Sequence, residues 1–132
     1  MSKLPEWIET LSVGNSIIDH QHRQLIIFFN RLADFSAARS PKAIAHFHDL
    51  LANGMRLLDE HFCDEEQLLR KNQCPSFQIH RAQHNEYREK LAAMHKAGMA
   101  GELLAKEIYE FAKHGLITHM RERDLLDKSF LK

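Results

Sequence analysis

The fold of this chain is decided by residues 41–72, PKAIAHFHDLLANGMRLLDEHFCDEEQLLRKN. The residues that would share one face of this stretch follow each other at steps of three, four or seven, which is the spacing of an α-helix. That face holds Phe47, Leu51, Leu58, His61, Glu65 and Leu68. Ser40 can cap the helix with Pro41 at its first position, and the helix should stop before Cys74-Pro75 because proline cannot continue it. The stretch therefore predicts one long amphipathic helix with two polar side chains on its apolar face.

Three further segments carry the same helical period. After an extended N-terminal arm over residues 1–16, helices are expected at about 17–38, 41–72, 76–97 and 102–128. The run Ala97-Gly98-Met99-Ala100-Gly101 is the clearest break in the second half. Helices of this length with short connections, and no strand pattern, predict an all-α, up-and-down antiparallel four-helix bundle. We expect it to form one domain over residues 1–132.

The composition and the apolar pattern argue against a nucleic-acid-binding, membrane-spanning or secreted protein. Lys+Arg and Asp+Glu both number 18, so the chain has no basic surplus that would favour nucleic acid as a partner. It holds no apolar run near the roughly 20 residues that cross a bilayer, and its N-terminus lacks the apolar core of a secretory signal. The two cysteines, Cys63 and Cys74, match neither a CxxC nor a zinc-ribbon spacing. We therefore expect a cytoplasmic protein with free thiols and without a membrane span.

Histidines and carboxylates stand in the apolar stripes, where an unpaired polar group is costly to bury. Along the chain these residues are His22, His61, Glu65, His80, His84, His119 and Asp124. Pairs four residues apart share one helix face, whereas Asp124 follows His119 by five and should straddle the inward face rather than stack on it. A single core histidine is more often hydrogen-bonded than bound to a metal. Five histidines and two carboxylates spread over four inward faces nevertheless indicate a metal site.

The number and type of these ligands favour two iron ions. Five imidazoles and two carboxylates exceed the four ligands of a structural zinc site, and imidazole suits iron. If three histidines hold one iron and two hold the other, two bridging carboxylates and a bridging oxygen leave one position open for dioxygen. The sequence lacks the Glu-x-x-His pairs of ferritin-like di-iron proteins. This histidine-rich set favours reversible binding over high-valent oxidation.

These motifs resemble the hemerythrin family over nearly the whole chain. The shared stretches are Trp7, Leu11 to Gly14, Ile18 to His22, His61 to Glu66, His80 to His84 and His119 to Asp124. The resemblance implies two non-haem irons (Fe2+/Fe3+) with an oxo or hydroxo bridge. The implied ligands are His80, His84 and His119 on one iron, His22 and His61 on the other, and Glu65 and Asp124 bridging both. Dioxygen would then bind at the iron of His22 and His61 as a hydroperoxide, whose proton comes from the bridging hydroxide.

Three positions depart from the usual family pattern. Gly115 stands where many members have Trp, Met120 stands where Ile is common, and Cys74 replaces a Tyr, whereas Leu116 matches the apolar residue that faces bound oxygen. We expect Gly115, Leu116 and Met120 to line the oxygen pocket. Gly inside a helix costs roughly 1 kcal/mol relative to Ala, so Gly115 should either open an oxygen channel or be covered by a bulky neighbour such as Phe111.

The resemblance predicts reversible dioxygen binding rather than catalysis, for storage or for delivery to an oxygen-consuming enzyme. Two alternatives stay open: an oxygen sensor that acts through a partner, and a di-iron enzyme that reduces peroxide or handles nitric oxide. We expect a monomer or weak oligomer. Five other histidines should lie at the surface or in hydrogen bonds, namely His20, His46, His48, His95 and His114.

Overall fold

The computed structural model describes residues 9–35, 41–99 and 105–132, and every regular element within these ranges is helical. The three long helices are α1 (Ser16–Phe35), α2 (Pro41–Lys71) and α3 (Phe77–Met99). A fourth helix begins as α4 (Ala105–Glu110) and continues through two π-helical segments, η2 (Phe111–Ile117) and η3 (Met120–Asp124). Short 3-10 turns precede and follow the bundle, η1 (Glu9–Leu11) and η4 (Lys128–Phe130).

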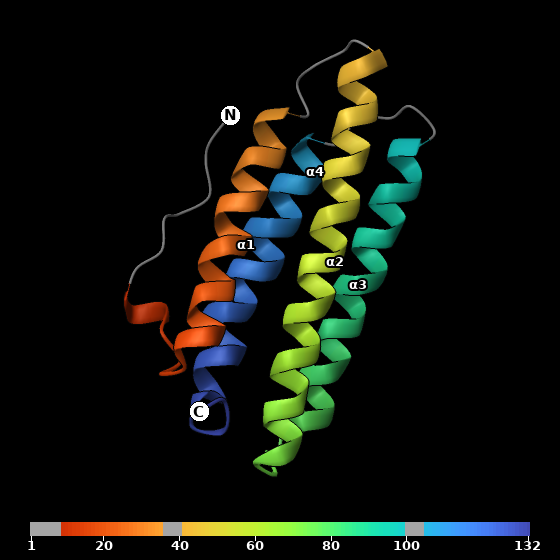
Figure 1. Cartoon of the computed structure of the whole chain (residues 1–132). Coiled ribbons are helices and arrows are strands. Elements are labelled where there is room, and N and C mark those ends of the chain that lie inside the picture. Colours follow the sequence, from red (N-terminus) through yellow and green to blue (C-terminus); the bar gives the residue numbers. More distant parts are fainter. Residues whose placement is uncertain (1–8, 36–40, 100–104) are drawn as a thin grey trace.

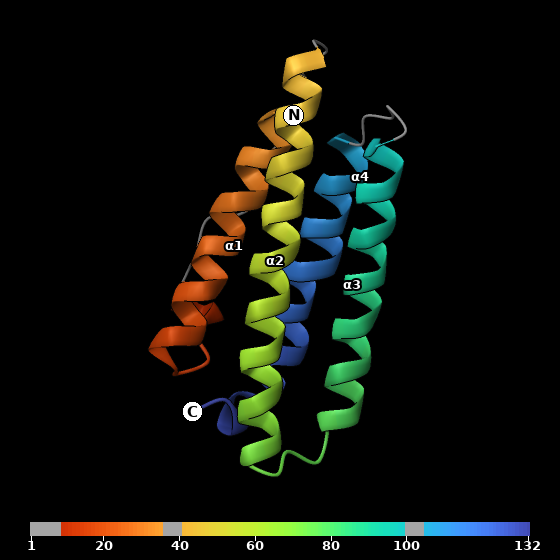
Figure 2. The same cartoon turned by 45° about the vertical axis from the view of Figure 1, so that its right-hand side comes forward.

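The four helices alternate in direction and lie side by side (Figure 1 and Figure 2). α2 packs against α1 and α3, and α1 also packs against α4, so the helices enclose a common core. The predicted all-α, up-and-down four-helix bundle is confirmed. No described helix is both long enough and apolar enough to cross a membrane.

Some predicted features fall outside the described residues. They are the end of the first helix at 38, the Ser40 cap, the start of the fourth helix at 102, and the arm as far as residue 8, with Trp7. In the described part of the arm, Leu11 and Val13 are buried, so this part packs against the bundle. The observed limits of α2 and α3 lie within two residues of the predicted ones.

Hydrogen bonds fix the junction between the arm and α1. Gly14 has a φ of 81°, a left-handed conformation that glycine adopts without strain. Asn15 Oδ1 then accepts hydrogen bonds from the N–H groups of Ile17 and Ile18, at 2.9 and 3.1 Å, and so caps the helix. Asn15 Nδ2 donates to the Leu131 carbonyl at 2.9 Å. One side chain thus caps α1 and ties it to the segment that follows the fourth helix.

α2 ends in a hydrogen-bonded turn that reverses the chain toward α3. Gln73 has a φ of 56°, its N–H donates to the Arg70 carbonyl, and the Cys74 N–H donates to the Leu69 carbonyl. This is a Schellman motif, which satisfies carbonyls that the helix end would otherwise leave unpaired. Leu69 and Cys74 also pack in one apolar cluster, and Pro75 cannot continue the helix.

Two apolar clusters make up the core, and a polar layer lies where they meet. On α1, His22 follows Ile18 of the smaller cluster and precedes Leu25 of the larger one. The other helices place their buried polar residues at the same junction, at positions 61 and 65, 80 and 84, and 119 and 124. All four helices therefore bring polar side chains to one level of the bundle.

We expect Asn15→Ala to lower the free energy of unfolding by about 1–2 kcal/mol, because it removes both cap bonds and the donor to Leu131. Chemical denaturation followed by circular dichroism measures this loss. Asn53→Ala, at an exposed position of α2, is the matched control and should change stability by no more than about 0.5 kcal/mol. Equal losses in the two variants would show that the cap contributes nothing specific.

Candidate metal centre

Seven polar side chains from all four helices meet in the polar layer, and each is at most 4% exposed. They are His22 from α1, His61 and Glu65 from α2, His80 and His84 from α3, and His119 and Asp124 from the fourth helix. These are the seven residues that the sequence singled out. The structure brings all of them together, in two groups that share both carboxylates.

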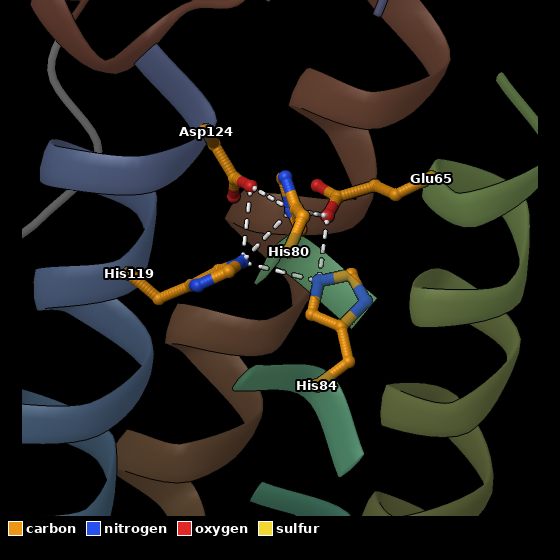
Figure 3. A group of neighbouring side chains, drawn as sticks. All are labelled: Glu65, His80, His84, His119 and Asp124. Carbon is orange, nitrogen blue, oxygen red and sulfur yellow. Dashed lines mark hydrogen bonds and ion pairs between the residues drawn. The ribbon is translucent and has the colours of Figure 1, made fainter. Parts of the chain in front are cut away.

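The first group contains three imidazoles that point toward one another, with a carboxylate on either side (Figure 3). His119 Nε2 lies 3.1 Å from His84 Nε2 and 3.2 Å from His80 Nε2. Glu65 Oε1 lies 3.1 Å from His84 Nε2. Asp124 Oδ1 lies 2.9 Å from His80 Nε2 and 3.1 Å from His119 Nε2. Five donor atoms therefore face a common centre.

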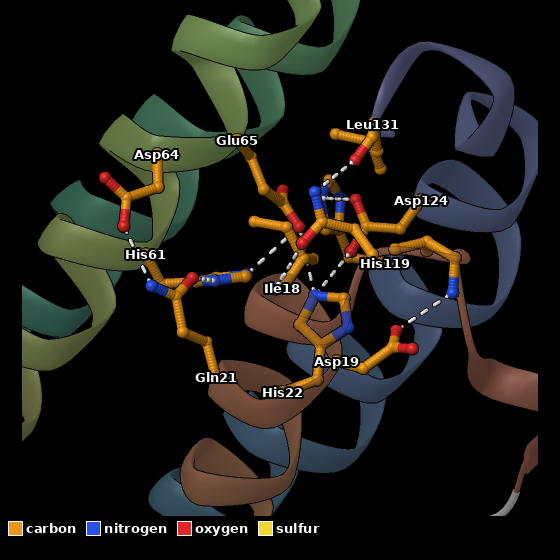
Figure 4. Close-up of polar contacts among 12 residues, drawn as sticks. Ile18, Asp19, Gln21, His22, His61, Asp64, Glu65, His119, Asp124 and Leu131 are labelled. Carbon is orange, nitrogen blue, oxygen red and sulfur yellow. Dashed lines mark hydrogen bonds and ion pairs between the residues drawn. The ribbon is translucent and has the colours of Figure 1, made fainter.

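The second group uses the other oxygen of each carboxylate (Figure 4). Glu65 Oε2 lies 3.0 Å from His22 Nε2 and 3.1 Å from His61 Nε2. Asp124 Oδ2 lies 3.2 Å from His22 Nε2. Glu65 and Asp124 thus each present one oxygen to the first group and one to the second, which is the arrangement of a bridging ligand.

The hydrogen bonds at the Nδ1 atoms of the imidazoles explain why the seven-residue cluster favours a bound cation. Four histidines place Nδ1 beside a side-chain oxygen: His61 beside Gln21 at 2.7 Å, His80 beside Asp127 at 2.9 Å, His84 beside Glu66 at 2.8 Å, and His119 beside Gln83 at 2.9 Å. Those oxygens accept a hydrogen bond from Nδ1–H, so a neutral imidazole carries its lone pair on Nε2. Lone pairs that face one another and two carboxylates repel unless a cation lies among them.

The spacing of the donor atoms also fits metal ions. Ligand atoms about 2.1 Å from one ion and at right angles to each other lie about 3.0 Å apart. The ion-pair contacts within the two groups range from 2.9 to 3.3 Å. The cluster can therefore hold metal, and its two groups fit a pair of ions that share the carboxylates.

Without metal, the carboxylates draw protons into the cluster. Burial alone would lower the pKa of His22, but its bonds to Asp124 and Glu65 outweigh burial and raise this pKa to about 10. The same balance raises the pKa of His80 to about 10. Burial would raise the pKa of Glu65, but His61, His22 and His80 hold it well below its usual value. Protons and metal ions therefore compete for these nitrogens.

The π-helical turn of η3 explains how Asp124 reaches the cluster beside His119. Residues five apart in an α-helix point in different directions, which is why the sequence predicted that Asp124 would straddle the inward face. In η3 the Leu125 N–H donates to the Met120 carbonyl, five residues earlier. This wider turn brings residue i+5 closer to residue i than an α-helix does. The structure thus differs from the α-helical expectation, and Asp124 lies against His119.

Four residues around the cluster were missed by sequence reasoning, namely Gln21, Glu66, Gln83 and Asp127. Each lies within three residues of a cluster member in the sequence, yet contacts a histidine of another helix. Neighbouring residues on a helix point about 100° apart, so such positions suggest exposure to solvent. Only the rotation of one helix against the next shows that these side chains reach an imidazole.

The three predicted pocket residues do not lie together. Leu116 and Met120 line a narrow apolar pocket between α1 and the fourth helix, which leaves no space for a water molecule. Gly115 instead lines a solvent-open groove of about 710 Å³ between α3 and the fourth helix. Tyr87 covers Gly115: its Cε1 would lie 3.4 Å from an added Cβ, and Phe111 is next at 3.9 Å.

The remaining histidines and both cysteines lie outside the two groups. His20, His46 and His114 are exposed, while His48 and His95 are half-buried with ring centroids 5.5 Å apart. Both cysteines are free thiols: Cys63 is exposed, and Cys74 is buried in the smaller apolar cluster.

Comparison with known proteins agrees with this geometry. A family model described as Hemerythrin HHE cation binding domain matches residues 13–128. A bacteriohemerythrin of Stenotrophomonas maltophilia (strain R551-3) is 25% identical over 118 residues, which cover 89% of this chain and 75% of the relative. A myohemerythrin of Theromyzon tessulatum is also 25% identical, over 126 residues that cover 96% of this chain and 92% of the relative. The family match spans all seven clustered residues, and the chain belongs to the hemerythrin family, as its sequence predicted.

Proposed function

We propose that this protein binds dioxygen reversibly at a di-iron centre formed by the seven clustered side chains. The observation that carries the proposal is the pair of shared carboxylates, each with one oxygen in a three-histidine group and the other in a two-histidine group. The proposed ligands are His80, His84 and His119 for one iron, His22 and His61 for the other, and Glu65 and Asp124 for both.

The chemistry of the donors supports iron. Imidazole nitrogen and carboxylate oxygen together suit iron, and five donors in one group exceed the four of a structural zinc site. Iron would supply the reversible electron transfer that lets dioxygen bind and leave. The names of the relatives, bacteriohemerythrin and myohemerythrin, support the same function for this chain.

The surroundings of the two-histidine group support a small apolar ligand there. This group offers one donor fewer than the three-histidine group, so an ion held there would keep one more coordination position for an added ligand. Leu25 and Ile26 follow His22 by about one helical turn, and with Leu116 and Met120 they line the narrow apolar pocket. An apolar wall disfavours water and anions but not dioxygen.

The physiological role of oxygen binding is part of the same proposal. We propose storage, or delivery to an oxygen-consuming enzyme, as the role of this protein. The alternatives are an oxygen sensor that acts through a partner and an enzyme that reduces peroxide or handles nitric oxide. A cytoplasmic location, and a monomer or weak oligomer, stay predictions of the sequence.

After expression with ample iron, we expect about two irons per chain, one for each donor group, and His84→Ala should lose most of this metal because a buried ligand shell becomes incomplete. Elemental analysis of the purified protein gives the metal content, and circular dichroism verifies folding. His20→Ala, at an exposed position two residues from His22, should keep both irons. Zinc in place of iron in the unaltered protein would refute the di-iron assignment.

Reduced, iron-loaded protein should develop a visible charge-transfer absorption when oxygen is added and should lose it when oxygen is removed. The reason is the histidine-rich donor set, together with an apolar pocket lined by helical neighbours of His22 and His119. Optical spectra over several oxygenation cycles measure the reversibility. Rapid consumption of oxygen with release of peroxide or water would instead favour the enzyme.

Gly115→Trp should slow oxygen release and autoxidation and leave the iron content unchanged. An indole at this position must displace Tyr87, whose ring centroid lies 5.5 Å from that of His119, and fill part of the groove between α3 and the fourth helix. Stopped-flow spectroscopy measures both rates. Gly115→Ala is the matched control, because an added Cβ meets Tyr87 at an ordinary contact distance. If the folded, iron-loaded Trp variant keeps its original rates, this position does not control access.

A further inference from the structure

Two kinds of hydrogen-bond acceptor contact the Nδ1 atoms of the candidate histidine ligands. In the three-histidine group, carboxylates accept hydrogen bonds from His80 and His84, whereas the Gln83 carboxamide accepts one from His119. In the two-histidine group, His61 Nδ1 lies 2.7 Å from a carboxamide oxygen, that of Gln21. The carboxylates bear a negative charge and the carboxamides do not, so His80 and His84 meet a different electrostatic environment from His61 and His119.

Each of the two carboxylates that face His80 and His84 forms an ion pair with an arginine. Glu66 Oε2 lies 2.8 Å from His84 Nδ1 and 2.9 Å from Arg88 Nη1. Arg88 is itself fixed, since its Nε donates to Asp59 at 2.8 Å and its guanidinium lies 5.2 Å from the centroid of the Phe62 ring. The cation keeps Glu66 ionised and restrains its rotation, so the proton stays on His84 Nδ1.

The second carboxylate repeats this arrangement on the same group. Asp127 is 3% exposed, and its Oδ2 lies 2.9 Å from His80 Nδ1 and 3.3 Å from Arg123 Nε. Glu66 comes from α2, whereas Asp127 lies directly after the fourth helix. Two independent elements thus direct arginine-paired carboxylates at the two histidines of α3.

The physical effect of such an acceptor is to strengthen the donor on the opposite side of the ring. An ionised carboxylate draws the Nδ1 proton toward itself, which raises the electron density at Nε2. A stronger Nε2 donor binds any metal ion more tightly, and the gain grows with the charge of the ion. The three-histidine group also offers one donor more than its neighbour.

We infer that Glu66 and Asp127 are positioning residues that make the His80/His84/His119 group the tighter metal position, and the one that stabilises the more highly charged ion. The inference rests on the proposed two-metal centre but not on oxygen binding. The two groups then have different roles: the three-histidine group holds its ion more tightly, and the two-histidine group has the weaker set of donors.

Stepwise addition of Co2+ to metal-free full-length protein, followed by optical absorption, tests the inference without iron or oxygen. The unaltered protein should bind in two phases of different affinity. Glu66→Gln keeps the shape and an acceptor for His84 but removes the charge, and should weaken the tight phase about 10- to 100-fold with the weak phase unchanged. Glu86→Gln removes an exposed carboxylate of α3 that pairs with Lys90, and should leave both phases unchanged.

Asp127→Asn repeats the test at His80, so the inference stays testable if one variant fails to fold. In iron-loaded protein, both variants should also shift the reduction potential to more positive values, because the higher-charge state loses more stabilisation. A tight phase and a potential that are unchanged in the folded variants would overturn the inference and leave the di-iron proposal intact. Uptake of a single Co2+ per chain by the unaltered protein would contradict the two-metal centre itself.

Discussion

The burial of two carboxylates at one level of a helical bundle is the constraint on which the rest of this structure depends. Glu65 and Asp124 are both 0% exposed, and an isolated buried carboxylate is strongly destabilising. Imidazoles from α1, α2, α3 and the fourth helix surround them, so each helix must present its histidines at the same height. The electrostatic requirement thus fixes the rotation and axial position of all four helices, which apolar packing alone leaves freer.

The parts of the structure that depend on one helix at a time could be predicted from the sequence. The stripe through Phe47 and Leu51 indicates a buried face, and His61 and Glu65 lie on that face because they are four residues apart. Contacts between helices could not be predicted in this way. The hydrogen bond between Gln21 and His61 depends on how α1 is rotated against α2.

Local helix geometry set a second limit to prediction. A period of 3.6 residues places Asp124 away from His119, and the π-helical turn that brings the two together has no signature in the apolar pattern. Gly115 and Leu116 show the same difficulty. Although they are adjacent in the sequence, one lines an open groove and the other a closed apolar pocket. Because neighbouring residues on a helix point about 100° apart, adjacency in the sequence does not place two residues in one pocket.

The small size of the second apolar cluster affects how long a metal ion would stay bound in the polar layer. Five buried residues of the described chain form this cluster, against fifteen in the larger cluster on the other side of the polar layer. Three of the five, Val13, Cys74 and Leu131, belong to segments outside the four long helices. A region with few buried apolar contacts opens locally at a lower free energy than the whole fold. The smaller apolar cluster is therefore the less stable cover of the polar layer. Local unfolding at this end of the bundle can let a metal ion enter or leave the layer while the larger apolar cluster stays folded.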